Sequence, residues 1–302
     1  MRIDLHVHSS ASDGTDPPAE VIQRAAIAGL DVVALTDHDT VAGLDEARAA
    51  LPPSVTLVPG MELSCLLNGS VTPEGFGGPG GMGGGSPLYE KAAPPGQQSL
   101  HMLGYLFDPE DPALSAETAL IRDDRIHRAR AMVDRLAGLG APVTWERVTG
   151  IAGDAVVGRP HIARAMAEAG VVETPAGAFT SEWIGDGGRA HVGRYAPDPA
   201  RAIALVRAAG GVPVLAHPRS PGYEISDEVI TRLAAVGLAG VEVFHPDHDD
   251  SERQRLTALA RSLDLAITGG SDDHGSFSGS GLGSETTPPE EYERLLSQAR
   301  TR

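Results

Sequence analysis

The sequence predicts an α/β protein with seven strands, and three observations predict this class. Short apolar runs, typical of strands buried on both faces, alternate with segments that carry apolar residues at helical spacing. Nearly every apolar run ends at or near a His, Asp or Glu. The 302 residues, of which 41% are hydrophobic, suffice for one large α/β barrel or two ordinary domains. Because α/β barrels build their sites at the carboxyl ends of the strands, we expect these polar side chains to meet at one edge.

The elements follow from local patterns. The seven expected strands cover residues 2–8, 31–36, 55–58, 100–105, 212–216, 240–244 and 265–269. A helix is expected over 19–30, because Pro17 and Pro18 precede it and Gly29 lies near its end. A shorter helix is expected over 41–51.

Two segments interrupt this alternation. The Gly/Pro-rich segment 68–99 is too poor in apolar residues to fold alone, so we expect a long loop, either a lid or a passive insertion. Residues 110–198 have a helical pattern, with one long helix or two over 113–140 and shorter helices around 144–149, 161–170 and 176–184. The expected organisation is a barrel in two parts, 1–109 and 199–302, with the helical subdomain 110–198 inserted between its fourth and fifth strands.

The first strand carries the clearest chemical signal. At strand period, Ile3, Leu5 and Val7 point one way, while His6 and His8 share the other face with Asp4. Strand neighbours two apart are roughly 6.5–7 Å apart by rise, so two imidazoles can converge on one metal. The alternative is a half-exposed edge strand with two solvated histidines.

Similar side chains stand at or near the ends of the other expected strands. The candidate metal ligands are His6, His8, Asp13, His38, Glu62, His101, His217, Asp272 and His274. Buried ionisable groups are costly unless they are paired or bind a metal, so a shared metal site explains the set better than nine separate causes. Imidazole and carboxylate together suit Mn, Fe or Zn and disfavour a site for Mg or Ca alone. The single cysteine, Cys65, excludes an intrachain disulfide and a thiolate zinc site.

Charge and hydropathy limit the classes of partner. The formal net charge is −17 at pH 7 and the isoelectric point is about 5.0, which argues against binding of duplex DNA but not of a small phosphorylated substrate. No apolar run approaches membrane length, and Met1 leads directly into the first strand without a signal peptide. We therefore expect a cytoplasmic protein without a membrane segment, and the sequence indicates no obligate protein partner.

At the candidate ligands the sequence resembles the polymerase and histidinol phosphatase (PHP) family. The motifs that carry the resemblance are Asp4-Leu5-His6-Val7-His8-Ser9, Thr36-Asp37-His38-Asp39, Gly60-Met61-Glu62, Ala216-His217-Pro218 and Gly270-Ser271-Asp272-Asp273-His274-Gly275. The sequence is most similar to the branch of nucleoside 3′,5′-bisphosphate phosphatases and RNA 5′-end exonucleases, through Arg159-Pro160-His161 and His101-Met102-Leu103-Gly104-Tyr105.

The resemblance implies a distorted (βα)7 barrel of the PHP fold that binds two to three divalent ions. It assigns one metal to His6, His8, Glu62 and Asp272. It assigns a second metal to His101 and His217, with Glu62 as the bridge. It assigns a third metal to Asp13, His38 and His274. Asp13 stands where some relatives carry His, and Asp37 and Asp39 are expected to accept hydrogen bonds from ligand rings.

The implied activity is metal-dependent phosphoester hydrolysis. A metal-bridging water is expected to attack phosphorus in line, without a protein nucleophile. The expected substrate is a nucleoside 3′,5′-bisphosphate, which loses its 3′-phosphate, or the 5′ end of short RNA. Histidinol phosphate or a cyclic sugar phosphate is the alternative substrate, and a non-catalytic scaffold or polymerase-associated module is the alternative to an enzyme.

Positive side chains outside the cluster are candidates for a second phosphate. Arg159 and His161 open an expected helix, where backbone N–H groups and a guanidinium can hold an anion. Arg125 and Arg128 are spaced to share a helix face, for which the alternative is a solvated, salt-bridged surface. The remaining candidates for substrate contact are Arg219 and His248.

Overall fold

The computed structural model describes residues 1–67, 98–153, 157–185, 187–221, 224–277, 279 and 281–299. The predicted loop 68–99 lies outside the described residues, apart from its last two positions, which begin a strand. The described chain divides into two compact units. The first unit comprises 1–67, 98–118 and 197–299, and the second comprises 119–196.

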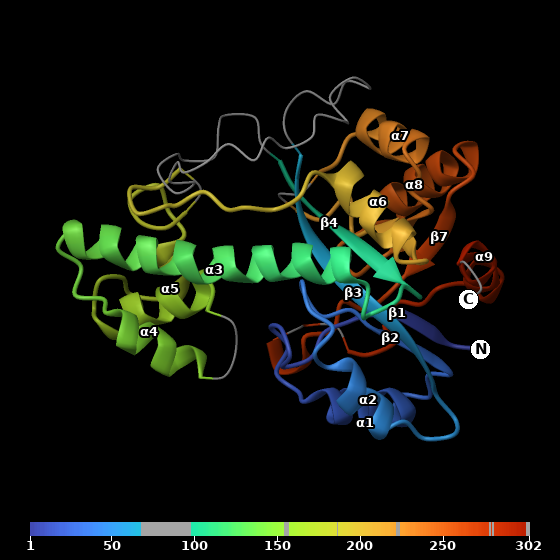
Figure 1. Ribbon diagram of the computed structural model, residues 1–302, viewed down its shortest axis with the longest axis horizontal. Helices are drawn as coiled ribbons and strands as arrows, with labels where there is room; N and C mark the ends of the chain where they lie inside the picture. Colours follow the sequence, from blue (N-terminus) through green and yellow to red (C-terminus); the bar gives the residue numbers. More distant parts are fainter. Residues whose placement is uncertain are drawn as a thin grey trace. The chain divides into compact units, whose positions relative to one another are not determined.

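The first unit contains a seven-stranded sheet whose spatial order is the order of the sequence. Its strands are β1 Ile3–Val7, β2 Val32–Leu35, β3 Thr56–Leu67, β4 Gln98–Tyr105, β5 Val212–Leu215, β6 Gly240–Phe244 and β7 Ala266–Gly269. Just beyond β1 and β7, the His8 N–H donates to the Asp273 carbonyl at 2.9 Å, and the Asp272 N–H donates to the His6 carbonyl at 2.9 Å. These bonds nearly close the sheet into a barrel, which confirms the predicted distorted TIM-like fold (Figure 1).

One strand runs against the others. β4 pairs antiparallel with both β3 and β5, whereas the remaining pairs are parallel. The uniform strand and helix alternation expected from the sequence does not include this reversal, because strand direction is set by tertiary pairing. The reversal has a consequence for the site: Ser64 of β3 pairs with His101 near the start of β4. His101 thus reaches the edge to which the other strands deliver residues at their carboxyl ends.

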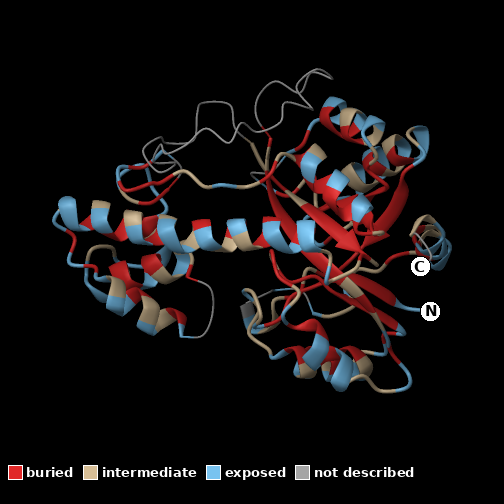
Figure 2. Cartoon of the chain, viewed as in Figure 1, coloured by how far each residue is buried: buried red, intermediate tan, exposed pale blue. Residues whose placement is uncertain are grey.

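Helices cover the sheet where the sequence alternates. The helices of this unit, apart from the start of α3, are α1 Pro18–Ile27, α2 Leu44–Ala49, α6 Pro199–Ala208, α7 Asp227–Ala235, α8 Asp250–Ser262 and α9 Pro289–Gln298, with a short 3-10 turn, η2 Gly275–Phe277. α1 contacts β2 and α2 contacts β3, while α6 packs on β4 and β5, and α8 packs on β6 and β7. Side-chain oxygens of Asp198, Ser226 and Asp249 cap α6, α7 and α8 by accepting from backbone N–H groups. Figure 2 shows the strands as almost continuously buried.

The second unit is helical and has its own apolar core. Its elements are the larger part of α3 Pro112–Gly138, α4 Trp145–Ala152, α5 Arg159–Glu168 and the 3-10 turn η1 Pro175–Ala178. α3 is one helix, and Leu136, Ile162 and Met166 are fully buried in the core. The helix expected over 176–184 is wrong, because only η1 forms there and turns follow it. In those turns the Gly185 N–H donates to the Thr180 carbonyl at 3.0 Å.

A search of the described helices finds none that is both long and apolar enough to cross a membrane. The cytoplasmic location stays a prediction.

Candidate metal centre

The two histidines of β1 are buried, with exposed fractions of 0% for His6 and 1% for His8. This excludes the alternative of a solvated edge strand. The pairing of β1 with β2 shifts register between Asp4 and Val7, which marks a bulge or irregularity within the strand segment that carries His6.

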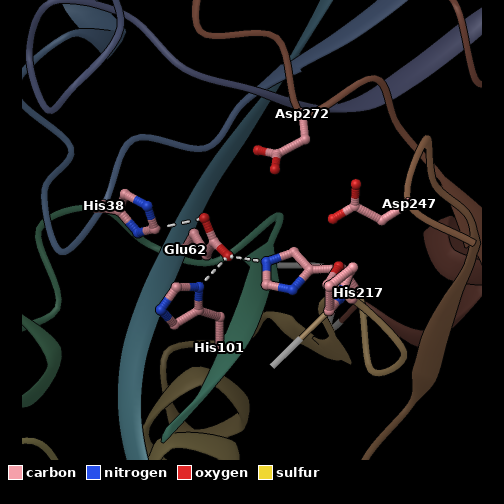
Figure 3. Close-up of a pocket in the computed structure, with 8 residues that line it drawn as sticks. His38, Glu62, His101, His217, Asp247 and Asp272 are labelled. Atoms are coloured by element: carbon pink, nitrogen blue, oxygen red, sulfur yellow. Dashed lines mark hydrogen bonds and ion pairs between the residues drawn. The ribbon is translucent and has the colours of Figure 1, made fainter. Parts of the chain in front are cut away.

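Glu62 of β3 is the centre of the site (Figure 3). Its Oε1 lies 2.8 Å from His101 Nδ1 and 3.0 Å from His217 Nε2. Its Oε2 lies 3.2 Å from the Nε2 atoms of both His6 and His8, and 3.3 Å from His38 Nδ1. A single buried carboxylate therefore contacts five imidazoles from four strands or strand ends, which is the arrangement expected of a bridging ligand.

The donor atoms form three overlapping groups, each with its atoms within 4.8 Å of one another. These groups are His6, His8, Glu62 and Asp272; His38, Glu62 and His101; and His8, Asp13, His38 and His274. The first group equals the first ligand set predicted from the sequence. The second adds His38 to the predicted pair of Glu62 and His101, and His217 contacts Glu62 beside it. The third adds His8 to the predicted trio.

The donor set fits divalent cations better than a hydrogen-bonded network. His8 Nε2 lies 3.1 Å from Asp272 Oδ1, yet neither atom has a hydrogen-bond partner among the described residues. The same is true of His38 Nδ1 within the described part of the chain. Buried polar atoms are normally paired, so donors that converge without a hydrogen bond indicate a shared cation.

The charges of the cluster oppose the effect of burial. Burial alone would raise the pKa of Glu62, but His38, His101 and His6 lower that pKa well below its usual range. Burial likewise raises the pKa of Asp272, and its imidazole neighbours outweigh this and lower it. Burial lowers the pKa of His8, but Asp272 and Glu62 raise it to about 10. The carboxylates are therefore ionised at neutral pH, and metal binding displaces a proton from His8, since ligation requires neutral imidazole.

Backbone strain and a close approach also mark the site. His217 and Asp272 have positive φ angles of 22° and 50°, which non-glycine residues rarely adopt. Gly270 stands against β1, where an added β-carbon would lie 2.3 Å from the Cβ of His6. The strand ends are therefore shaped around the ligands at a conformational cost.

Comparison with known proteins agrees with this geometry. The family model described as "PHP domain" matches residues 4–76 of this chain. A 5′-3′ exoribonuclease of Haemophilus influenzae is 31% identical over 278 residues, which is 90% of each chain. The chain belongs to the PHP family. A crystal structure assigned as a metal-dependent phosphoesterase, from Bifidobacterium adolescentis, matches this PHP protein with a TM-score of 0.78 and 33% identity, over 99% of this chain and 96% of that one.

Two further relatives of the PHP protein differ in the substrates for which they are named. A 3′,5′-nucleoside bisphosphate phosphatase of Chromobacterium violaceum is 29% identical over 276 residues, 90% of this chain and 87% of the relative. A phosphoribosyl 1,2-cyclic phosphate 1,2-diphosphodiesterase of Eggerthella lenta is 30% identical over 275 residues, 91% and 94% of the two chains. The predicted family and branch are confirmed, and all three relatives are named for hydrolysis of phosphoester bonds.

Sequence reasoning missed the buried acid that holds two ligands of the PHP site. Glu242 of β6 is 1% exposed; its Oε1 lies 2.9 Å from His6 Nδ1, and its Oε2 accepts from the His217 N–H at 2.8 Å. His245, just beyond β6, is also buried, and its Nε2 lies 3.4 Å from Asp272 Oδ2. A signal for Glu242 was present, because a charge in the middle of a buried apolar strand needs a partner.

The two acids predicted to orient ligand rings hold serines. Asp37 accepts from the Ser9 N–H at 2.8 Å, the Ser9 hydroxyl at 2.7 Å and the Ser12 hydroxyl at 2.7 Å. Asp39 accepts from the N–H and hydroxyl of Ser64 at 2.7 and 2.9 Å. Asp37 thus fixes the loop after His8, and Asp39 fixes β3 beyond Glu62. Glu242 contacts the far nitrogen of the His6 ring. Contact of Asp37 and Asp39 with ligand rings stays a prediction.

The predicted substrate-binding residues lie in both units. In the first unit, Arg219 forms ion pairs with Asp227 and Glu252, and His248 is buried with its Nδ1 donating to the Val243 carbonyl at 2.9 Å. The His248 Nε2 accepts from the Arg219 N–H at 3.2 Å, so the contacts of His248 are structural. Substrate contact by these two residues stays a prediction.

The other four candidates belong to the second unit. The Arg128 Nε donates to the Val192 carbonyl at 2.8 Å, and the Arg159 guanidinium lies 5.9 Å from the centre of the Phe179 ring. His161 Nδ1 accepts from the Gly158 N–H at 3.0 Å, which closes the start of α5. For these residues and for Arg125, contact with a substrate stays a prediction.

Proposed function

We propose that this PHP protein, a hydrolase of phosphoester bonds, removes the 3′-phosphate of a nucleoside 3′,5′-bisphosphate and also acts on the 5′ end of short RNA. The observation that carries the proposal is the convergence of imidazoles and ionised carboxylates on Glu62, which fits a multinuclear metal site. Divalent ions bound there supply an activated water and neutralise phosphoryl oxygens. The named activities of the Haemophilus and Chromobacterium relatives support the choice of substrate.

The residues around the site supply negative charge for the cations and position the ligands. The cysteine and the serine near the site are not arranged to act as nucleophiles. Glu62 and Asp272 supply fixed negative charge for the cations, and Glu242 holds His6 and His217 in place. Cys65 is buried, and its thiol donates to the Leu63 carbonyl, 3.7 Å away. No base in the described part of the chain activates the Ser220 hydroxyl in the pocket, since it lacks a hydrogen-bond partner there. These contacts support hydrolysis without a covalent protein intermediate.

We further propose that the cluster binds two to three ions of Mn, Fe or Zn. The overlap of the three donor groups through Glu62, His8 and His38 supports closely spaced ions. The proposed ligands are those predicted from the sequence, with His8 and His38 each within reach of a second position. Imidazole with carboxylate suits all three metals.

We also propose a second anion site, which accounts for the expected preference for a bisphosphate over a monophosphate. We assign it to Arg159 and His161, at the start of α5, together with Arg125 and Arg128. Support comes from the place of the Arg159 guanidinium at the start of a ten-residue helix, where the helix dipole favours an anion. The acidic net charge supports a small substrate over duplex DNA, and no protein partner is proposed.

The test is phosphate release by the Mn-loaded protein from adenosine 3′,5′-bisphosphate, adenosine 5′-monophosphate and histidinol phosphate. Ring opening of a ribose 1,2-cyclic phosphate is measured beside it by chromatography of the phosphate monoester product. The proposal predicts the highest kcat/KM for the bisphosphate. It also predicts that Arg159→Ala removes this preference by raising KM. Higher turnover of histidinol phosphate or of the cyclic phosphate would assign the protein to another substrate.

A further inference from the structure

A cavity of about 200 Å³ lies beside the cluster, and three of its lining residues have no role in the account above. Five lining residues are candidate ligands: His38, Glu62, His101, His217 and Asp272. The other three are Ser220, Pro221 and Asp247. Figure 3 shows Asp247 across the pocket from His38, with Glu62 between them. If the phosphoryl group of a substrate binds at the metal centre, the alcohol to which it is esterified contacts the remaining three residues.

Ser220 brings a buried hydroxyl to this pocket. The residue is 5% exposed, and its N–H donates to the His217 carbonyl at 3.1 Å, which fixes it next to a candidate ligand. Its Oγ has no hydrogen-bond partner among the residues that the structure describes. An unpaired buried hydroxyl is costly, so this atom is suited to a polar group of a bound molecule.

Asp247 brings an acceptor that no cation among the described residues neutralises closely. Its side chain is 49% exposed, and its Oδ2 lies 4.0 Å from His245 Nδ1, the one ion-pair contact of this carboxylate within the described residues. The Asp247 N–H donates to the same Nδ1 at 3.1 Å, so the loop position is fixed. The neighbouring Arg219 guanidinium is paired with Asp227 and Glu252 instead.

The chemistry of this pair limits what it can bind. An ionised carboxylate only accepts hydrogen bonds, and it repels phosphate oxygens. A serine hydroxyl both donates and accepts. An uncharged hydroxyl of the substrate satisfies both residues, because it donates to Asp247 and accepts from Ser220. A deoxy sugar offers neither bond and leaves the Ser220 hydroxyl unpaired.

We propose that Ser220 and Asp247 form a subsite for the hydroxyl next to the scissile ester, so that they select ribonucleotides over deoxyribonucleotides. The inference rests on the proposed function, in which phosphorus is bonded to a 3′-oxygen and the adjacent group is the ribose 2′-hydroxyl. It narrows the proposed substrate from any nucleoside bisphosphate to one that carries a ribose 2′-hydroxyl.

The experiment compares adenosine 3′,5′-bisphosphate with its 2′-deoxy analogue on the Mn-loaded full chain. The wild type is expected to prefer the ribose form about 10- to 100-fold in kcat/KM, the effect of a hydrogen bond to a charged group. Asp247→Ala is expected to bring this ratio to within about threefold of one, and Ser220→Ala to lower it partly. Asp45→Ala is the matched control, because that carboxylate is 95% exposed and pairs with Arg48.

A second measurement separates the subsite from the proposed reaction. Calorimetric binding of adenosine 5′-monophosphate and 2′-deoxyadenosine 5′-monophosphate is expected to show the same preference, lost in Asp247→Ala. Equal turnover of the two bisphosphates by the wild type, or a preference that persists in a folded Asp247→Ala, overturns the inference. If neither bisphosphate releases phosphate, the proposed function fails, and the binding preference alone then supports or overturns the subsite. If Asp247→Ala does not fold, Ser220→Ala decides.

Discussion

Glu242 provides the sharpest test of how the metal site is held. It contacts His6 through one carboxylate oxygen and the backbone of His217 through the other, at 2.9 and 2.8 Å. These two ligands belong to different proposed metals. Removing Glu242 should therefore lower the affinity for both of those metals, while the group of Asp13, His38 and His274 keeps its contacts.

The size of the effect follows from these two bonds. A hydrogen bond to a charged group contributes about 1.5–3 kcal/mol, so Glu242→Ala loses about 3–6 kcal/mol across the two contacts. Glu242→Gln preserves the shape, but its amide oxygen can accept from only one donor, while its NH₂ faces another donor. Loss of a carboxylate behind a metal-binding histidine typically costs 10- to 100-fold in metal affinity. We expect that loss in Glu242→Gln, with a larger loss in Glu242→Ala.

The assay is the metal content of gel-filtered protein after Mn titration, measured by plasma mass spectrometry together with kcat. Glu117→Gln is the matched control, because Glu117 is also 1% exposed and its carboxylate pairs with Arg201 at 2.6 Å, within the same unit. We expect this control to lose stability but to keep wild-type metal content. Wild-type metal affinity in Glu242→Gln, or equal metal loss in Glu117→Gln, would refute the reasoning.

Three further predictions concern stability. Removal of metal by a chelator should lower the melting temperature by several degrees, since ligand at 100 times Kd contributes about 2.7 kcal/mol; an unchanged value in differential scanning fluorimetry would argue against a metal site. Gly270→Ala should reduce metal binding and lower the free energy of unfolding by about 1–3 kcal/mol or more, because the added β-carbon would lie 2.3 Å from the Cβ of His6. Gly150→Ala in α4, where an added β-carbon meets no atom within 4 Å, should raise the free energy of unfolding by about 0.5–1 kcal/mol. Urea unfolding of both variants checks these opposite changes. Tyr105→Phe should destabilise by about 1–2 kcal/mol, because its buried hydroxyl donates to the Leu5 carbonyl at 2.8 Å; an unchanged urea midpoint would contradict this.

The sequence predicted the strands and the site edge because both depend on local patterns. His6 and His8 were paired by the two-residue period of one strand. Glu62 was expected just after a strand over 55–58, but it lies inside β3, which continues to Leu67. The structure brings all nine candidate ligands into overlapping groups or, for His217, into contact with Glu62. Which donors share a metal stays a prediction.

What could not be predicted depends on contacts between distant segments. The reversal of β4 is set by its pairing with β3 and β5, which no local pattern encodes. Glu242 stands in a run that is apolar on both sides, so its contact with His6, 236 positions away, is visible only in the fold. The helix expected over 176–184 does not continue beyond η1, because the N–H groups of Trp183 and Gly185 both donate to the Thr180 carbonyl and fold the chain into turns.

The most direct test of the central claim is phosphate release from adenosine 3′,5′-bisphosphate by Mn-loaded wild type and Glu62→Ala, with metal content measured on the same samples. The account predicts multiple turnovers by the wild type, and at least about a hundredfold loss of kcat with loss of metal in the variant. No phosphate release by the metal-replete wild type, or full activity in Glu62→Ala, would contradict it.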